Sequence, residues 1–401
     1  MTVGGVAHVG EDSAPLIFLI AGEASGDALG AGLMRALREL TDGHVRFAGV
    51  GGEQMAAEGL VSQFPISEMA VMGIVEILPK APKLLRRVAE VVEAAWSMQP
   101  AAVVTIDSKA FTMRVQKRLH ARRAEAGRGE PRLIHWVPPT VWAWRPGRAK
   151  VIARYLDRLL TLFPFEPAYF EPHGLPTAFV GHPAAKRPAG DGALFRARHR
   201  LPKGAPVLGV FPGSRPGEVR HLLPVFGDAV ARLAPRYAGL QVVLPTVPVV
   251  VDQVRQAVEG WSAPVTLVTD HRHKIDAIAA CAVALAASGT VTLELTLAGI
   301  PTVVAYRVNA LSAIIARRLV DPDSVVLTNK LVGRRVVPQF LQEDCTAERL
   351  TVALERLFDD PRARSEQGAA SEAVRGMLLP DGEDPSMRAA KVVLQEIGYD
   401  E

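Results

Sequence analysis

The sequence predicts an α/β fold with two Rossmann-like, doubly wound domains that face each other across a cleft and are followed by a helical tail. Short apolar runs alternate with segments of helical periodicity almost from end to end, which is typical of repeated βα units. A Pro- and Gly-rich stretch over residues 181–192 interrupts this alternation, which indicates a domain boundary. A chain of 401 residues also exceeds what one hydrophobic core usually organises, so two domains are expected.

The first domain is expected over residues 15–185. Its parallel strands are predicted at Leu16–Ala21, Val45–Val50, Ala102–Thr105, Leu133–Trp136, Arg158–Leu162 and Ala178–Val180, with amphipathic helices between them. Residues 1–14 precede the pattern and share none of it. They are predicted to form a flexible leader.

The second domain is expected over residues 186–345. Its strands are predicted at Val207–Phe211, Gln241–Pro245, Val265–Val268, Val283–Ala287 and Thr302–Ala305. Residues 346–401 contain only helical patterns, at Thr346–Phe358, Arg364–Met377 and Ser386–Glu396. This tail is expected to pack across one or both domains. It could also be exchanged between the subunits of an oligomer.

The composition excludes several classes of protein. Its 49% of hydrophobic and 22% of charged residues exclude a disordered chain. No run of eighteen apolar residues occurs and the first residues lack a secretory pattern, so neither a membrane span nor a signal peptide is expected. Cys281 and Cys345 lie far apart and outside any metal-binding spacing, which favours the reducing cytoplasm.

Positive charge gathers in two helical segments. The residues concerned are Lys80, Lys83, Arg86 and Arg87, and then Arg114, Lys117, Arg118, Arg122 and Arg123. Either these are solvated helix surfaces or they face anionic lipid. Nucleic acid is not expected, because no aromatic residues interleave with the charges.

An apolar segment precedes the first basic helix. Its apolar residues are Met69, Val71, Met72, Ile74, Val75, Ile77 and Leu78. Beside the basic residues they are predicted to contact a membrane or acyl chains, and a core-facing loop is the alternative.

Two acids follow strands of the first domain. Glu23 lies in the turn Gly22–Asp27 after the first strand, and Asp107 follows the strand at Ala102–Thr105. Carboxyl ends of parallel strands form the ligand-binding edge of such sheets. Asp107 is therefore a candidate general base and Glu23 a second catalytic acid. Helix capping by Ser25 or Asp27, and for Asp107 a capping role or a pairing with Lys109, are the structural alternatives.

The second domain carries two candidate phosphate-binding turns. Gly213, Ser214 and Arg215 follow the strand at Val207–Phe211, where amides, a hydroxyl and a guanidinium can bind a diphosphate. Ser288, Gly289 and Thr290 follow the strand at Val283–Ala287, and Glu294 one turn later can accept both hydroxyls of a ribose. A capped turn with a solvated arginine is the alternative at the first turn, and ordinary capping accounts for Ser288 and Thr290 at the second.

No metal site or cofactor is expected. His271 and His273 lie two residues apart with Asp276 nearby, but they lack a third strong ligand. The nucleotide sugar is expected to be a substrate.

Taken together, the motifs resemble those of the lipid A disaccharide synthase family. The resemblance spans about residues 15–395 and is carried by Ala21–Asp27, Ala70–Glu76, Val141–Arg145, Leu162–Glu166, Gly181–Pro183, Pro212–Arg215 and Ser288–Thr290. It implies a GT-B fold and an inverting glycosyltransferase of lipid A biosynthesis, the pathway of the lipopolysaccharide anchor. It further implies transfer from UDP-2,3-diacylglucosamine to lipid X, which is 2,3-diacylglucosamine 1-phosphate, with a β(1→6) bond formed, UDP released and no metal.

The resemblance also implies roles for single residues. Asp107 matches the base that activates the acceptor hydroxyl, Glu23 an acid near the acceptor, Arg215 the donor-phosphate residue and Asn329 an asparagine near the nucleotide. An enzyme of this kind works at the inner face of the cytoplasmic membrane. The family usually continues its aspartate with Ala-Pro-Asp-Phe-Asn, whereas this chain has Ser108–Thr112, so the acceptor side departs from the pattern.

Other functions are compatible with parts of the sequence. Another GT-B hexosaminyltransferase, such as the peptidoglycan lipid II enzyme, or a UDP-N-acetylglucosamine 2-epimerase would share the donor domain. A dinucleotide-dependent oxidoreductase is disfavoured, because the first βα turn lacks GxGxxG. A non-catalytic peripheral membrane module would not need Asp107 and Arg215 together.

Overall fold

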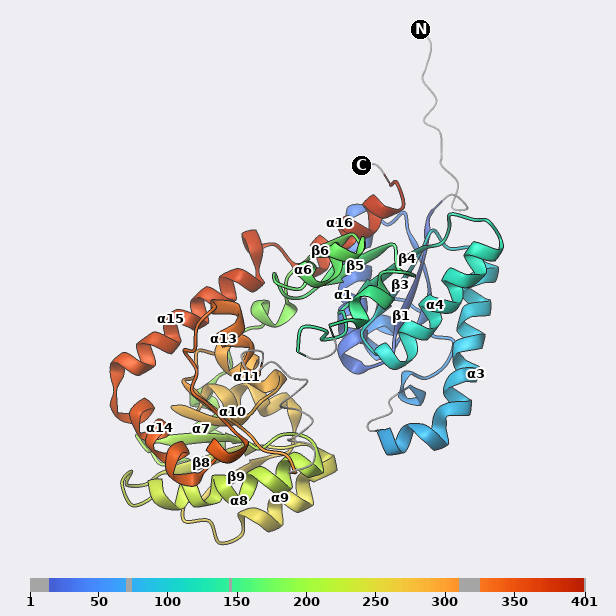
Figure 1. Ribbon diagram of the computed structural model, residues 1–401. Helices are drawn as coiled ribbons and strands as arrows, with labels where there is room; N and C mark the ends of the chain where they lie inside the picture. Colours follow the sequence, from blue (N-terminus) through green and yellow to red (C-terminus); the bar gives the residue numbers. More distant parts are fainter. Residues whose placement is uncertain (1–13, 70–73, 144–145, 310–324, 400–401) are drawn as a thin grey trace. The chain divides into compact units, whose positions relative to one another are not determined.

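The computed structural model describes residues 14–69, 74–143, 146–309 and 325–399, without the side chains of 74–81 and 271. The chain forms two compact units (Figure 1). Unit 1 comprises Met1–Pro183 and Leu378–Glu401, and unit 2 comprises Ala184–Met377.

Unit 1 is built on a parallel six-stranded sheet of order β2-β1-β3-β4-β5-β6. Its strands are β1 (Leu16–Ala21), β2 (Arg46–Val50), β3 (Ala102–Ile106), β4 (Arg132–Trp136), β5 (Arg158–Thr161) and β6 (Thr177–Phe179). Its helices include α1 (Ala24–Leu40), α2 (Glu53–Ala57), α3 (Ile74–Met98), α4 (Lys109–Glu125), α5 (Arg148–Ile152), α6 (Pro167–Phe170) and α16 (Pro385–Glu396).

Helices cover both faces of this sheet, and β1 shows why. Ile17 and Leu19 point into a core shared with α1 and α16, whereas Phe18 and Ile20 point into a second core shared with α3 and α4. The two pairs of helices accordingly lie on opposite sides of the sheet (Figure 1). A strand that is apolar on both faces is typical of a doubly wound parallel sheet.

Unit 2 repeats this architecture with the strand order β12-β11-β10-β7-β8-β9. Its strands are β7 (Val207–Phe211), β8 (Gln241–Pro245), β9 (Val265–Val268), β10 (Val283–Ala287), β11 (Thr302–Tyr306) and β12 (Gln339–Leu341). Its helices include α7 (Gly192–Arg198), α8 (Pro216–Leu233), α9 (Val251–Val258), α10 (Lys274–Ala279), α11 (Thr290–Leu297), α13 (Leu327–Val332), α14 (Ala347–Asp359) and α15 (Pro361–Leu378).

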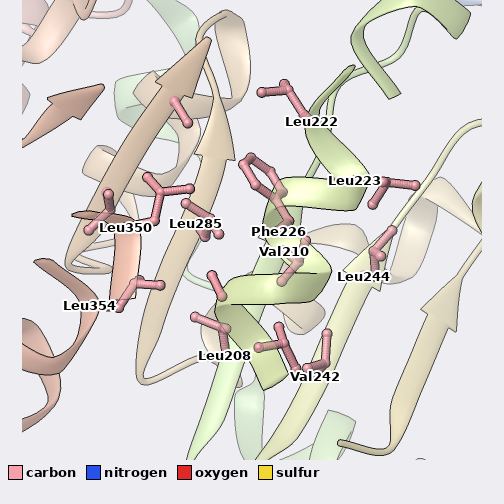
Figure 2. Packing of buried hydrophobic residues seen from close by; sticks show 14 of the residues in the cluster. Leu208, Val210, Leu222, Leu223, Phe226, Val242, Leu244, Leu285, Leu350 and Leu354 are labelled. Atoms are coloured by element: carbon pink, nitrogen blue, oxygen red, sulfur yellow. The ribbon is translucent and has the colours of Figure 1, made fainter. Parts of the chain in front are cut away.

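The larger core of unit 2 lies between the sheet and two helices from distant parts of the chain. Figure 2 shows Phe226 of α8, Val210 of β7 and Leu285 of β10 in this core, with Leu350 and Leu354 contributed by α14. Burial of such side chains stabilises the unit by about 1.5–3 kcal/mol each. The first tail helix is thus an integral part of the domain.

The predicted fold class is confirmed: two parallel sheets carry helices, and the C-terminal segment is helical. The last helix, α16, belongs to unit 1, where it packs on α1 and its Ala389 and Val393 share a core with Leu33. Its Glu396 pairs with Arg132 at the start of β4, with 2.6 Å between Nη2 and Oε2. Among the described helices, none combines the length and the apolar composition needed to cross a bilayer.

Candidate active site

The first and third strands of unit 1 bring the two predicted acids together. β1 and β3 are neighbours in parallel register, with Ala21 beside Ile106, so the segments after them leave the same edge of the sheet. Gly22 lies directly against Ser108: a Cβ atom on Gly22 would be 2.2 Å from Ser108 Oγ. Glycine is required at this position because the Ser108 side chain, in the turn after the adjacent strand β3, fills the space that a side chain would need.

Asp107 has a constrained main chain. Its φ is 49° and that of Ser108 is 45°, so two consecutive non-glycine residues lie in the left-handed region. The Asp107 amide donates to Trp136 O at 2.9 Å, and its carbonyl accepts from Thr112 Oγ1 at 2.6 Å. These bonds hold the residue in a costly conformation, which is common at functional sites.

The carboxylate of Asp107 is only partly used within the fold. Its Oδ1 accepts from the Ser108 amide at 2.8 Å, and no described residue bonds its Oδ2. No ion pair joins it to Lys109 in the part of the chain that the structure describes, although Lys109 is exposed nearby. One oxygen therefore remains for an incoming proton donor.

Glu23 shares the electrostatic environment of Asp107. The pKa of Glu23 is raised above its ordinary value, first by partial desolvation and then by the negative charge of Asp107, while Lys109 opposes the shift. Its side chain remains exposed at the carboxyl edge. Two coupled carboxyl groups at the end of parallel strands are a suitable arrangement for proton transfer.

Asp27, which the sequence suggested as a cap of its own helix, stabilises a different turn. It is 4% exposed, and its carboxylate accepts from the amides of Gly52, Gln54 and Met55 at 2.7, 2.9 and 3.1 Å. It thereby caps α2 and ties the turn after β2 to α1. Asp27 is a structural residue of the edge, not a ligand group.

A third feature of this edge was assigned no role from the sequence. Glu166 follows β5 and is 2% exposed. Its Oε2 accepts from the amides of Leu162 and Phe163, both at 3.0 Å, and its Oε1 accepts from Trp142 Nε1 at 3.2 Å. The Trp142 ring packs edge-on against Phe163 and Phe165, whose rings stack at 5.5 Å. The sequence signal for this residue was an acid that closely follows two aromatic residues, Phe163 and Phe165, in an apolar segment.

Burial raises the pKa of Glu166 to about 7. The unfolded chain releases this proton near its ordinary value of 4.5, while the folded protein still holds it. The contribution of Glu166 to stability therefore falls as pH rises from about 4.5 to about 7 and is constant above, because the unfolded state binds fewer protons at this group in that window. We expect the melting temperature of wild type, minus that of Glu166→Gln, to fall between about pH 5 and 7 and then level off.

Thermal unfolding of both proteins across this pH range measures the effect. Glu171→Gln, which changes an exposed acid in the same segment, is the control and should give a difference that does not vary with pH. A constant difference for Glu166→Gln as well would show that Glu166 is ionised throughout.

The predicted membrane-contact segment is only partly described. Met69 is 5% exposed and packs with Phe64, Val88 and Phe111, so this residue belongs to the core and is unavailable to lipid. Val71 and Met72 lie outside the described residues. The same holds for the side chains of four further predicted contacts, Ile74, Val75, Ile77 and Leu78, of which the structure describes only the helical backbone.

Much of the positive charge on α3 and α4 is neutralised within unit 1. Arg87 pairs with Glu68 and Glu90, and Arg122 pairs with Glu93. Three other pairs follow the same pattern: Lys83 with Glu68, Arg86 with Glu90, and Arg123 with Asp157. Lys117 and Arg118 of α4 are exposed, and no ion pair to a described residue involves them.

In unit 2, the turn after β7 differs from the predicted anion site. The amides of Ser214 and Arg215 donate to Glu218 Oε2 at 3.1 and 3.3 Å, and the Arg215 guanidinium bonds Glu218 Oε1 at 2.8 Å. A Cβ atom on Gly213, whose φ is 102°, would lie 2.4 Å from that carboxylate. The protein's own carboxylate thus occupies these amides, contrary to the expectation that they face a ligand.

Two groups of this turn remain accessible. The Ser214 side chain is exposed, and the Arg215 side chain is 77% exposed, so most of its donors face solvent. Tyr306, at the end of β11, lies close enough for Glu218 and Arg215 to affect its pKa. Burial is the main cause of the raised pKa, to which Glu218 adds and which Arg215 opposes.

The turn after β10 provides an open main chain. Gly289 has φ 154° and ψ −164°, a conformation essentially restricted to glycine, and no atom of the described residues lies within 4 Å of where its Cβ would be. Thr290 is exposed at the start of α11. Ser288, by contrast, donates its hydroxyl to Val325 O at 2.6 Å. A ligand can therefore approach the backbone of Gly289 and the hydroxyl of Thr290.

Glu294 and Asn329 are both held by other parts of unit 2. Glu294 bonds Lys274 Nζ at 2.5 Å and lies 3.6 Å from Arg187 Nη1, which explains an acid in an apolar helix. Asn329 is 5% exposed; its Oδ1 accepts from the amides of Val336 and Val337, both at 2.9 Å. Asn329 stabilises that loop, which differs from the expected contact with a nucleotide.

No metal-binding group is evident: among the described residues, no three His, Cys, Asp or Glu side chains are placed to hold a metal ion.

Comparison with known sequences gives extensive matches. A family model described as lipid-A-disaccharide synthetase matches residues 17–384. The lipid-A-disaccharide synthase of Rhodospirillum centenum is 50% identical over 384 residues, which cover 95% of this chain and 94% of that protein. The enzyme of that name from Paramagnetospirillum magneticum is 49% identical over 386 residues, covering 95% and 97%.

Solved structures resemble the chain in fold at low sequence identity. An S. aureus MnaA–UDP co-structure has a TM-score of 0.64 at 12% identity, covering 96% of this chain and 98% of that one. A UDP-N-acetylglucosamine 2-epimerase has a TM-score of 0.62 at 14% identity, covering 97% and 98%. Acinetobacter baumannii MurG has a TM-score of 0.55 at 12% identity, covering 95% and 99%. At these identities the likeness shows the GT-B fold alone.

Proposed function

Because the chain belongs to the lipid-A-disaccharide synthetase family of GT-B glycosyltransferases, we propose that it transfers 2,3-diacylglucosamine from UDP to the 6-hydroxyl of lipid X. The observation that carries this proposal is the carboxyl pair at the edge of unit 1. Asp107 keeps one oxygen unbonded by described residues, and its charge raises the pKa of Glu23.

In the proposed reaction Asp107 accepts the proton of the acceptor hydroxyl. The hydroxyl oxygen forms a bond to the anomeric carbon, and the bond from that carbon to the diphosphate oxygen breaks. Attack from the face opposite UDP inverts the configuration and gives the β(1→6) disaccharide. General base catalysis of this type contributes about 10²–10⁴-fold to the rate.

UDP leaves with additional negative charge, which cations and hydrogen-bond donors of unit 2 can stabilise. We assign this role to the Arg215 guanidinium, with Ser214, Gly289 and Thr290 as further donors. A single well-aimed donor contributes about 3–4 kcal/mol. The proposal includes no metal ion, as the resemblance implies.

Because both proposed substrates carry acyl chains, we infer that the protein binds peripherally to the inner face of the cytoplasmic membrane, as the resemblance implies. The exposed Lys117 and Arg118 of α4 support such binding to anionic lipid. Sedimentation with anionic vesicles checks this part of the proposal, and a protein that stays in the supernatant would contradict it.

Purified protein with both substrates, in buffer containing EDTA, tests the reaction. We expect disaccharide 1-phosphate and UDP in equal amounts. Release of UDP without disaccharide would indicate another use of the donor, and the absence of both products would exclude the proposed function.

Arg215→Ala is expected to weaken UDP binding by about tenfold to a hundredfold, because a charge-assisted bond to phosphate contributes about 1.5–3 kcal/mol. Titration calorimetry with UDP measures this affinity. Arg220→Ala is a matched control, since Arg220 is an exposed arginine of α8, the helix that begins directly after Arg215. Equal UDP affinity in Arg215→Ala and wild type would remove Arg215 from the donor site.

A further inference from the structure

A buried polar network joins the carboxyl ends of β3 and β4. Thr105, Gln116 and His135 are all fully buried, and Thr105 and His135 are direct neighbours in the register of the two strands. Gln116 Nε2 lies 2.9 Å from Thr105 Oγ1 and 2.8 Å from Ile134 O. Thr105 Oγ1 lies 2.8 Å from His135 Nδ1, and His135 Nε2 lies 3.1 Å from Val137 O.

The donors and acceptors of this network can be assigned. Val137 O can only accept, so His135 Nε2 carries the hydrogen. The imidazole is neutral because burial lowers its pKa to about 3, so Nδ1 accepts from the Thr105 hydroxyl, whose other acceptor, Ile134 O, is farther away at 3.3 Å. Gln116 Nε2 then donates to the remaining lone pair of Thr105 Oγ1. The hydrogen bonds therefore run in one direction, from Gln116 to Val137.

The network ends on a strained residue. Val137 has φ 71°, and a β-branched side chain in the left-handed region is a genuine outlier that the surrounding structure must enforce. Its amide donates to Leu160 O at 3.1 Å and its carbonyl accepts from His135. The amide and the carbonyl of the strained residue are thus both fixed by hydrogen bonds, the first to β5 and the second to a side chain of β4.

The same strand end holds Asp107. Trp136 lies between His135 and Val137, and its carbonyl accepts the Asp107 amide at 2.9 Å. The left-handed residues Asp107, Ser108 and Val137 therefore lie at the ends of adjacent strands and share one set of main-chain bonds. A shift of Val137 would move the Trp136 carbonyl and with it the backbone of Asp107.

We propose that His135 is a positioning residue: its Nε2–H bond to Val137 O fixes the strained end of β4 and thereby the main chain of Asp107. The inference rests on the proposed function insofar as Asp107 is the base. The network is also costly, because the buried Gln116 Oε1 has no hydrogen-bond partner among the described residues. A requirement for fixed geometry at Asp107 explains why a polar network is retained in this core.

Thr105→Val, which keeps the shape of the side chain but removes its hydroxyl, tests the proposal. We expect kcat to fall by about tenfold to a hundredfold, since small displacements of catalytic groups have effects of this size, with KM and UDP affinity near wild type. Thr105→Ser, which keeps the hydroxyl, should retain the wild-type kcat. Thr41→Val removes another buried, hydrogen-bonded hydroxyl of unit 1, at the end of α1, and should leave kcat unchanged.

Two measurements do not depend on turnover. Nitrogen-15 spectra of wild type should show His135 as the neutral Nε2–H form from about pH 5.5 to 8.5. Hydrogen exchange of the Asp107 amide should accelerate in Thr105→Val and not in Thr41→Val. An Nδ1–H tautomer, unchanged exchange of that amide, or equal kcat loss in both valine variants would overturn the positioning role. Lack of disaccharide synthesis by wild type would instead overturn the proposed function.

Discussion

Asp107→Asn is expected to lower kcat by about 10²–10⁴-fold, the contribution of a positioned general base, while UDP affinity stays at the wild-type level. Asparagine keeps the shape of the side chain and an oxygen that can accept from the Ser108 amide. It also tolerates the left-handed backbone at φ 49°. What it lacks is the ability to take a proton from the acceptor hydroxyl. Steady-state kinetics and UDP titration of the same preparation separate the two quantities.

Asp42→Asn is a matched control for this substitution. Asp42 is another aspartate of unit 1 in the left-handed region, at φ 48°, and it is exposed in the turn after α1. Its replacement should leave kcat and UDP affinity unchanged. Full turnover by Asp107→Asn would exclude Asp107 as the base, and loss of UDP affinity would give it a donor-side or structural role.

The coupling of the two acids provides a measurement that needs no substrate. Because the charge of Asp107 contributes to the raised pKa of Glu23, Asp107→Asn should lower that pKa toward its ordinary value. Partial desolvation of Glu23 persists in the variant and keeps part of the shift. An unchanged titration of Glu23 by NMR would show that the two carboxyl groups are independent.

The central strands β3, β7 and β10 were predictable because each is an apolar run that is buried on both faces, and such runs are visible without any knowledge of tertiary contacts. β12 was not predicted because its three residues, Gln339–Leu341, form a short edge strand and do not make up an apolar run. The helical tail was predictable from its periodicity. Its distribution over the two units depends on packing, as with α14 against α8, β10 and β11, and no local pattern encodes that.

The candidate site was predictable only where backbone topology decides it. Glu23 and Asp107 follow adjacent parallel strands, so their proximity follows from strand order. Glu218 illustrates the limit: it lies three residues after Arg215, the spacing of a capping box, but an arginine at the first position conceals the motif. His135 lies inside an apolar strand, and only the structure shows its hydrogen bonds.

Gly22→Ala is the second substitution with a large expected effect. The new methyl carbon would lie 2.2 Å from Ser108 Oγ and 2.5 Å from Ser108 Cβ, so one of the two turns must move. Overpacking of this kind destabilises by about 1–3 kcal/mol. Because Ser108 follows Asp107 directly, we expect kcat to fall by up to about a hundredfold as well.

The clash involves only the Ser108 side chain, which permits a rescue. Ser108→Gly removes both clashing atoms, and glycine accepts the φ of 45° at that position without strain. The double variant should therefore regain most of the melting temperature and kcat lost in Gly22→Ala. Gly147→Ala is the control, because Gly147 has φ −59° and no atom of the described residues lies within 4 Å of its Cβ position. A double variant no better than Gly22→Ala would show that the glycine is required for another contact, such as close approach of a ligand to its backbone.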